Sequence, residues 1–323
     1  MYPFSALGIN MKVKKKQTDI VKYNNALNKY AIYNFRGVEQ NIFFCLLSLF
    51  FDVTNTARIV SDNELMRQIN IDDMMRKVHY TRTSTAVFQT KVKSVLDKIL
   101  SPILQIEDGS QITGLVCFRK YHCDLAANTL QVWIDHDFYD LIKGGYFTRF
   151  ELAEFVALGN SQYAKSLYRI LKQYRLQGWH IITVDELKRQ LNIPDWYRQR
   201  EIDERVFKVS IPQLKRELDL IDDATGNKRI AFRDLKVEKQ RKDGSRGRGG
   251  TIISYKFTWN NSADLKEIAE YKQEKQAKAE QQQLIQTKPK PKRKKLQDEQ
   301  GRPLAEGYRR DEDGNLVPDL LRS

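Results

Sequence analysis

The chain has 323 residues, of which 41% are hydrophobic and 11% aromatic, so a wholly disordered chain is excluded and two globular domains are expected. The formal net charge is +14. Residues 261–323 hold 14 Lys and Arg against 12 Asp and Glu, so residues 1–260 hold 41 against 29 and carry +12 of that charge. A basic folded body favours a polyanionic partner, because each neutralised phosphate releases counterions. The alternative is a basic surface with no partner.

The cysteines and the most apolar run exclude two further classes. Cys45, Cys117 and Cys123 are odd in number and lack CxxC spacing, so we expect neither a disulfide framework nor a zinc site, and a reducing cytoplasm fits best. The apolar run from Ile42 to Phe51 is shorter than the roughly 20 residues that a membrane span needs. We therefore expect a buried helix and no membrane partner.

In the first half, an apolar helix is predicted over residues 38–51, followed by a short strand at Ile59 and Val60. Ser61 with Glu64 is typical of a capping box, which predicts that a short helix begins there. Another helix is expected over residues 83–100, with Val87 among its packing residues. Strand-like runs follow at residues 102–106, 115–122 and 130–134.

The second half shows the same order. A helix is predicted over residues 161–176, closed by Gly178. Thr183 with Glu186 forms a second capping box after a short β-branched run. The next helix, over residues 202–218, contains Pro212, which predicts a kink or a restart near Ser210. Strands are expected at residues 229–237 and 251–259, joined by a Gly-rich loop over residues 239–250.

A sequence repeat supports this parallel. Residues 59–71 (IVSDNELMRQINI) and 181–193 (IITVDELKRQLNI) share seven identical residues of thirteen at an offset of 122. Helix, strand, short helix, longer helix and hairpin is the order of a winged-helix domain. The sequence therefore predicts an α+β fold of two tandem winged-helix domains related by internal duplication. The expected ranges are a flexible basic N-terminus (1–19), domain 1 (20–145), domain 2 (146–260) and a charged tail, disordered or helical (261–323).

The residues expected to contact DNA in domain 2 lie around the second helix of its helix-turn-helix, which would enter the major groove. Arginine reads guanine with two parallel hydrogen bonds, so Arg205 is the leading candidate, with an ion pair to Glu201 as the alternative. In the hairpin loop, basic residues among glycines favour phosphate or minor-groove contact, although RNA binding by an RG segment is an alternative. The candidates here are Arg198, Arg200, Arg205, Lys208, Arg241, Lys242, Arg246 and Arg248.

In domain 1, the matching turn and helix start hold Arg76, Lys77, Tyr80, Arg82 and Thr83, expected to read bases or hold phosphates. For Thr83 the alternative is an ordinary N-cap.

Catalytic motifs are not evident. The sequence lacks a Walker A pattern, and its four histidines stand singly, so we expect no metal, no cofactor and no enzymatic activity. Asp135 and Asp137 flank His136, which we interpret as helix capping rather than metal binding.

With these elements in place, the chain resembles the iteron-binding plasmid replication initiator family over residues 20–260. The resemblance is carried by NKYxIYNF and VEQNIF within residues 28–43, FTRFEL at 147–152, SQYAKSLYRILKQYR at 161–175 and ELKRQLNIP at 186–194. In the matched helix, the stripe Lys165, Arg169, Lys172 and Arg175 is expected to be mostly a solvated face, and the resemblance implies that Lys165 could approach the DNA backbone.

The resemblance implies that the protein binds directly repeated double-stranded origin DNA, promotes melting of adjacent DNA and recruits host replication proteins such as a helicase or initiator. It also implies a homodimer in equilibrium with a monomer in the bacterial cytoplasm, with domain 1 supplying the dimer contact and the dimer repressing the protein's own gene. Two alternatives stay open, namely a winged-helix transcriptional repressor without initiator activity, and a replication nickase or primase.

The tail lies outside the resemblance. A charged, Gln-rich helix is predicted over residues 264–286, and KPKPKRKK at 288–295 is expected to be disordered.

Overall fold

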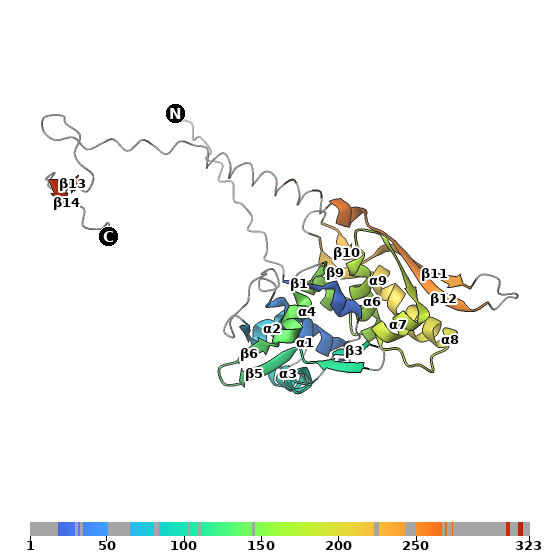
Figure 1. Cartoon of the computed structure of the whole chain (residues 1–323), viewed down its shortest axis with the longest axis horizontal. Helices are drawn as coiled ribbons and strands as arrows, with labels where there is room; N and C mark the ends of the chain where they lie inside the picture. Colours follow the sequence, from blue (N-terminus) through green and yellow to red (C-terminus); the bar gives the residue numbers. More distant parts are fainter. Residues whose placement is uncertain are drawn as a thin grey trace, which may run out of the picture. The chain divides into compact units, whose positions relative to one another are not determined.

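In the computed structural model (Figure 1), the chain forms two compact units, Met1–Leu265 and Lys266–Ser323. The structure describes residues 19–29, 32, 35–50, 65–80, 84–101, 104–108, 111–143, 146–222, 226–242, 250–266, 269, 273, 308–310 and 316–318. The predicted N-terminus (1–19) and tail (261–323) therefore lie largely outside the described residues. Within the tail, Tyr308–Arg310 (β13) and Leu316–Pro318 (β14) pair antiparallel, where the sequence predicted no strand.

The first half contains the elements of one winged helix. In chain order they are α1 (Gly37–Ser48), β2 (Met66–Asn70), α2 (Ile71–Lys77), α3 (Thr85–Ile99), β5 (Phe118–Asp124) and β6 (Thr129–Ile134). The strands form an antiparallel sheet in the order β2-β6-β5. Helices α2 and α3 form the helix-turn-helix, and β5 with β6 is the wing. An additional hairpin, β3 (Leu104–Asp108) with β4 (Gln111–Leu115), leads into β5.

The second half repeats this order. Its elements are α6 (Gln162–Gln173), β8 (Trp179–Thr183), α7 (Val184–Leu191), α8 (Gln199–Glu201), η3 (Ile202–Phe207), α9 (Lys208–Lys215), β11 (Arg233–Arg241) and β12 (Ile252–Asn260). Its sheet has the order β11-β12-β8, so the strand before the helix-turn-helix again pairs with the last strand of the wing. A second additional hairpin joins β9 (Glu217–Ile221) to β10 (Lys228–Ile230). The predicted tandem winged-helix architecture is confirmed.

The sequence repeat does not align the two domains. Ser61 and Glu64 lie outside the described residues, and the predicted short helix after them is wrong, because Met66–Asn70 is a strand paired with β6. Helix α2 begins at Ile71, where the Asn70 side chain accepts hydrogen bonds from the backbone N–H groups of Asp72 (2.9 Å) and Asp73 (3.2 Å). Strands β2 and β8 begin 113 residues apart rather than 122.

The second helix-turn-helix begins as predicted. The Thr183 hydroxyl accepts the backbone N–H of Glu186 (3.2 Å), and the Glu186 carboxylate accepts the backbone N–H of Thr183 (3.3 Å). This capping box satisfies amides that would otherwise be unpaired at the start of α7. Asn192, with a φ of 52°, then ends the helix in the left-handed conformation.

The long helix after this turn changes its hydrogen-bond pattern. It begins as α8, continues as π-helical η3 and returns to α-helical geometry at Lys208. The predicted restart near Ser210 is thus displaced by two residues, and Pro212 lies inside α9. Short π-helical segments within α-helices often occur at functional positions.

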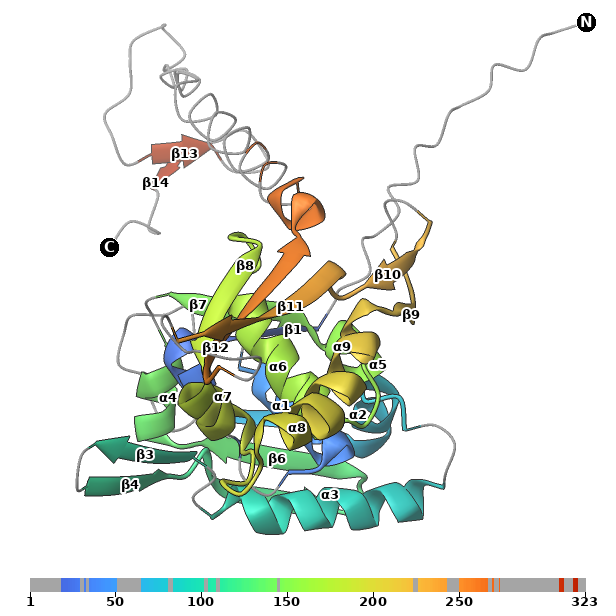
Figure 2. The ribbon, with the colours of Figure 1, turned by 90° about the vertical axis from the view of Figure 1, so that its right-hand side faces the viewer.

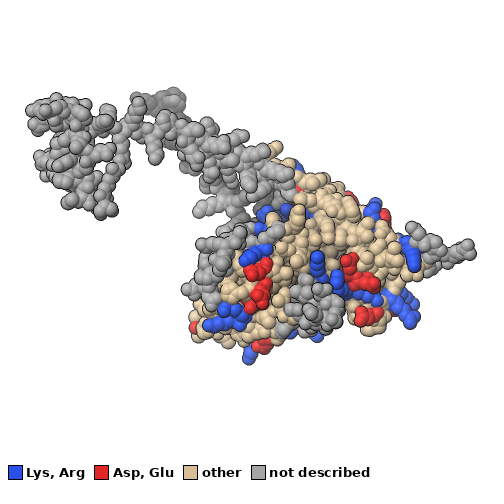
Figure 3. Space-filling model, viewed as in Figure 1, with Lys and Arg blue, Asp and Glu red and all other residues tan. Residues whose placement is uncertain are grey.

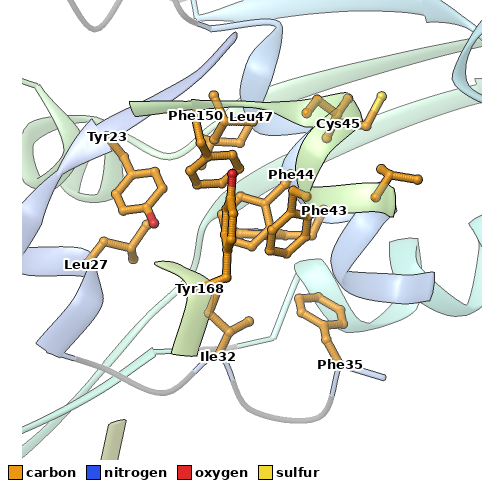
Figure 4. Packing of buried hydrophobic residues seen from close by; sticks show 14 of the residues in the cluster. Tyr23, Leu27, Ile32, Phe35, Phe43, Phe44, Cys45, Leu47, Phe150 and Tyr168 are labelled. Atoms are coloured by element: carbon orange, nitrogen blue, oxygen red, sulfur yellow. The ribbon is translucent and has the colours of Figure 1, made fainter. Parts of the chain in front are cut away.

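The two winged helices share one hydrophobic core (Figure 4). The Phe44 ring of α1 lies 4.9 Å from that of Phe155 in α5 (Leu152–Ala157), and Phe150 of β7 (Phe147–Glu151) lies 5.3 Å from Tyr168 of α6. Strand β1 (Ile20–Asn24) pairs with β7, and it is followed by η1 (Asn25–Lys29). Helix α4 (His136–Ile142) precedes β7, and the Asp135 side chain caps it, as predicted. A common core of this kind fixes the two domains relative to each other.

Candidate nucleic-acid interface

Each winged helix presents one long helix whose outer face carries polar side chains. Reading helix 1 is α3, and reading helix 2 is the continuous segment α8–η3–α9, residues Gln199–Lys215. In Figure 2, α3 runs along the lower edge and α8 faces the viewer. Figure 3 shows Lys and Arg at the end of the molecule beside the wing strands β11 and β12, interspersed with acidic residues. A helix-turn-helix places such a helix in the major groove.

The predicted cations of reading helix 2 are all exposed, but their surroundings differ. The Arg200 guanidinium donates to Glu204 at 3.1 Å, an exposed i, i+4 pair of little energetic weight. Arg198 and Lys208 are exposed. The Glu201 carboxylate accepts the backbone N–H of Arg198 at 3.0 Å, so it caps the helix. The alternative ion pair between Glu201 and Arg205 is therefore not needed to explain either residue.

Arg205 lies against two aromatic rings. Its guanidinium carbon is 5.4 Å from the ring centroid of Trp196 and 5.4 Å from that of Tyr197, and the two rings meet edge to face at 4.4 Å. A hydrogen bond from Arg205 to the Tyr197 hydroxyl, aided by the carboxylates of Glu201 and Glu204, raises the pKa of Arg205. These aromatic partners come from the turn before the helix, and no spacing pattern in the sequence predicts that they contact Arg205.

The wing is tied to reading helix 2 by a short chain of hydrogen bonds. Lys239 of β11 donates to Asp203 at 2.5 Å, and Gln199 donates to the other carboxylate oxygen of Asp203 at 3.0 Å. The Tyr255 hydroxyl of β12 donates to Gln199 at 2.8 Å. The helix and the wing strands are therefore held in one relative position.

Only part of the predicted wing loop lies within the described residues. Arg241 and Lys242 are exposed at the end of β11, and the Lys242 backbone N–H donates to the Thr251 carbonyl at 3.0 Å. Arg246 and Arg248 lie outside the described residues, so their contact with phosphates stays a prediction.

The predicted residues of domain 1 are more constrained than expected. Arg76 pairs with Asp73, and Lys77 pairs with Asp19. The Tyr80 ring packs on Phe88 at 5.3 Å, against the core. Arg82 and Thr83 lie outside the described residues, and the residue at the N-cap of α3 is Ser84.

Sequence reasoning missed the outer face of reading helix 1. Val87 was expected to pack but is 47% exposed, whereas Phe88 is fully buried, so the buried stripe begins one residue later than predicted; its other predicted members, Val92, Val95, Leu96 and Ile99, are buried. With Phe88 and Val92 as the inner face, the helical period turns Thr90, Lys91 and Lys93 outward, where they are exposed. Lys91 also lines a pocket at the start of α1 together with Arg36 and Lys98.

The expectation of a solvated basic stripe on α6 is wrong. Lys165 is 0% exposed and donates to Asn41 of α1 at 2.6 Å and to the Phe155 carbonyl at 2.7 Å. Arg169 is buried beside Asn28, and Lys172 pairs with Glu154 at 2.9 Å. This face of α6 packs against the first winged helix, so in this structure Lys165 is not placed to contact DNA. Burial lowers the pKa of Lys165 well below its usual value.

Two other functional classes, metalloproteins and membrane-spanning proteins, leave structural signatures. Among the residues that the structure describes, no cluster of three or more His, Cys, Asp or Glu side chains is placed to hold a metal ion. Within the same residues, no helix combines the length and the apolar character that crossing a bilayer requires.

Comparisons with known proteins bear on the whole arrangement. Residues 20–172 match the family described as "Initiator Replication protein, WH1". The match to the initiator family extends through α6, beyond the predicted domain boundary at residue 145, and that boundary stays a prediction.

A curated relative and a solved structure add to this. A probable replication protein of Bifidobacterium longum (strain NCC 2705) is 32% identical over 177 residues, which are 54% of this chain and 57% of that protein. The chain thus aligns with a little over half of that relative's length. The Pi initiator protein, solved in complex with iteron DNA, has a TM-score of 0.54 at 15% identity and covers 76% of this chain and 99% of its own. At this identity the likeness concerns the fold, and it supports two winged helices in tandem in this chain.

Proposed function

We propose that this chain initiates plasmid replication by binding directly repeated origin DNA with its two winged helices. The observation that carries the proposal is a single compact unit, Met1–Leu265, with two helix-turn-helix segments on a common core. The match of residues 20–172 to the replication initiator family and the fold shared with the Pi initiator support the proposal.

The reading helices and the wing would have different roles in binding DNA. Reading helices 1 and 2 would each enter a major groove, with Arg205 as the base-reading residue of the second. The wing residues Arg241 and Lys242 would contact phosphates, which fix register without reading sequence. The common core couples the two winged helices, so both would engage one repeat together and their binding energies would combine.

Further activities follow from the same proposal. The bound protein would promote melting of adjacent AT-rich DNA and recruit host replication proteins, such as a helicase or the host initiator, in the bacterial cytoplasm. A homodimer in equilibrium with the monomer would repress the protein's own gene. The protein would have no enzymatic activity, since the energy for melting would come from binding DNA.

The test uses the DNA that flanks the gene. Fluorescence anisotropy with a duplex of one direct repeat, about two helical turns long, should show tighter binding than with a shuffled duplex of equal composition. A plasmid carrying that region should replicate only in cells that supply the protein. Binding solely to an inverted repeat, without plasmid replication, would indicate the repressor. Nicking of supercoiled plasmid in the presence of magnesium would indicate the nickase.

A further inference from the structure

The turn before reading helix 2 presents an indole to solvent. Trp196 is 63% exposed, although Tyr197 beside it is buried. The turn itself is well held: Lys188 donates to the Asp195 carbonyl at 2.9 Å, and the Tyr197 backbone N–H donates to the Pro194 carbonyl at 3.0 Å. The position of Trp196 is thus set by the backbone of the turn rather than by burial of its own ring.

Both rings of this turn face the same guanidinium. Arg205 lies at 5.4 Å from each ring centroid, within the distance at which cation–π attraction acts. The Tyr197 hydroxyl accepts a hydrogen bond from the guanidinium of Arg205 and is also hydrogen-bonded to Tyr163 of α6. Burial raises the pKa of Tyr163 to about 12. Two rings and one hydroxyl therefore restrain a side chain that would otherwise sample many rotamers.

The restraint leaves the chemistry of base reading available. A guanidinium has five N–H donors, and guanine O6 and N7 accept two parallel N–H bonds from one edge of it. The neighbouring Arg200 is engaged with Glu204 at 3.1 Å, and a lysine such as Lys208 cannot form the bidentate pair. Among these three cations, Arg205 alone combines a planar donor edge with a fixed orientation.

We propose that Trp196 and Tyr197 are positioning residues that determine specificity by holding Arg205 in the orientation in which it reads a guanine. The inference rests on the proposed function, since it requires that reading helix 2 enters the major groove. A pre-oriented side chain loses less freedom on binding, so the bidentate contact is stronger and a wrong base is rejected more strongly.

The experiment uses the full chain and a pool of random duplexes. Sequences enriched by the parent protein define the site, and a set of duplexes with each base pair changed singly gives discrimination at each position from Kd values. Arg205→Ala should lose roughly tenfold or more at one G·C pair. Trp196→Ala should lose part of the same discrimination at the same pair, with an unchanged dependence of Kd on salt, and Trp196→Phe should restore it. The double variant W196A/R205A should discriminate no worse there than R205A.

Trp179→Ala is the matched control, because Trp179 is 45% exposed on β8 and the structure shows no contact between it and Arg205. It should leave discrimination unchanged, and all variants should unfold at temperatures close to the parent's. The inference is overturned if W196A weakens binding equally at every sequence, if its effect adds to that of R205A, or if it discriminates as the parent does. Failure of the parent to enrich any sequence would instead overturn the proposed function.

Discussion

Lys239 of strand β11 donates a 2.5 Å hydrogen bond to Asp203 of reading helix 2, across 36 positions of sequence. This contact joins the two parts of a winged helix that meet DNA separately, the helix in the groove and the wing on the backbone. Both side chains are about a third exposed, so solvent screens the ion pair and it adds little to the free energy of unfolding. Its main effect is to orient the helix relative to the wing.

A double-mutant cycle should show that the coupling between Asp203 and Lys239 in the folded state is weak. Asp203→Ala, Lys239→Ala and the double variant should give a coupling free energy of unfolding below about 1 kcal/mol. In DNA binding, both single variants should lower affinity for the enriched site more than for a shuffled duplex. Equal losses on both duplexes would mean that the pair does not orient the helix. Lys143→Ala, which breaks the i, i+3 ion pair with Asp140 at the end of α4, serves as the control.

The buried Lys165 predicts an unusual dependence of stability on pH. Burial lowers its pKa in the folded state below 10.5, so between that lowered pKa and 10.5 the unfolded state holds a proton that the folded state lacks. The free energy of unfolding should therefore rise with pH over this window, by up to about 1.4 kcal/mol per pH unit. Below the lowered pKa the penalty is fully present and constant.

Lys165→Met isolates this effect, because methionine fills similar space without titrating. Urea unfolding of the parent and the variant from pH 7 to 10.5 should show that their difference in unfolding free energy changes with pH. Lys93→Met, at an exposed position of α3, should track the parent. A constant difference between the parent and Lys165→Met would show that Lys165 keeps its proton when folded.

The wing makes a different prediction, on salt. Arg241→Ala should weaken binding to the enriched and shuffled duplexes alike and reduce the slope of log K against log salt by about 1, as expected for loss of one phosphate contact. Anisotropy titrations between 50 and 300 mM salt would measure the slope. Lys236→Ala is the control, because Lys236 is an exposed cation on the same strand but farther from the hairpin loop. A loss of affinity confined to the enriched duplex in Arg241→Ala would instead assign Arg241 to base reading.

Local signals in the sequence predicted those parts of the fold that depend on neighbouring residues. The capping box of Thr183 and Glu186 works within one turn of helix, so its pattern sufficed. The similar pattern at Ser61 and Glu64 misled, because the residues after it form strand β2 under the influence of pairing with β6. Pairing partners that lie 59 to 67 positions away leave no local signal in the sequence, which is why β2 was predicted as a helix.

The site shows the same limit. Arg205 could be chosen from its type and its place in the helix-turn-helix, but the rings that hold it are set by the geometry of a turn. The buried stripe of α6 was mistaken for a solvated face because amphipathic patterns assume one buried side. Here Lys165 and Arg169 face the first winged helix, whose presence on that side only the tertiary structure reveals.

The backbones of the two domains approach each other closely at Gly37, the first residue of α1. A Cβ atom there would lie 2.3 Å from the carbonyl oxygen of Asn160, which is backbone and has little room to move. Gly37→Ala should therefore lower the free energy of unfolding by more than about 2 kcal/mol. Gly226 has a φ of +70°, but the space around it is open, so Gly226→Ala should lower the free energy of unfolding by only about 1 kcal/mol. Urea unfolding that ranked the two in the opposite order would show that the start of α1 can shift away from Asn160.

His180 predicts a loss of stability in mild acid. Its ring stacks on Tyr174 at 3.9 Å, and burial, opposed only weakly by Glu186, lowers its pKa to about 4. Since the unfolded histidine titrates near 6.5, stability is full above that pH and should fall by up to about 3 kcal/mol as the pH drops from 6.5 to 4. His180→Gln should remove this part of the acid dependence in urea unfolding, whereas His122→Gln, at an exposed position of β5, should retain it. Equal acid sensitivity in the parent and in His180→Gln would show that the strand and the helix end separate enough in the folded state to admit the proton.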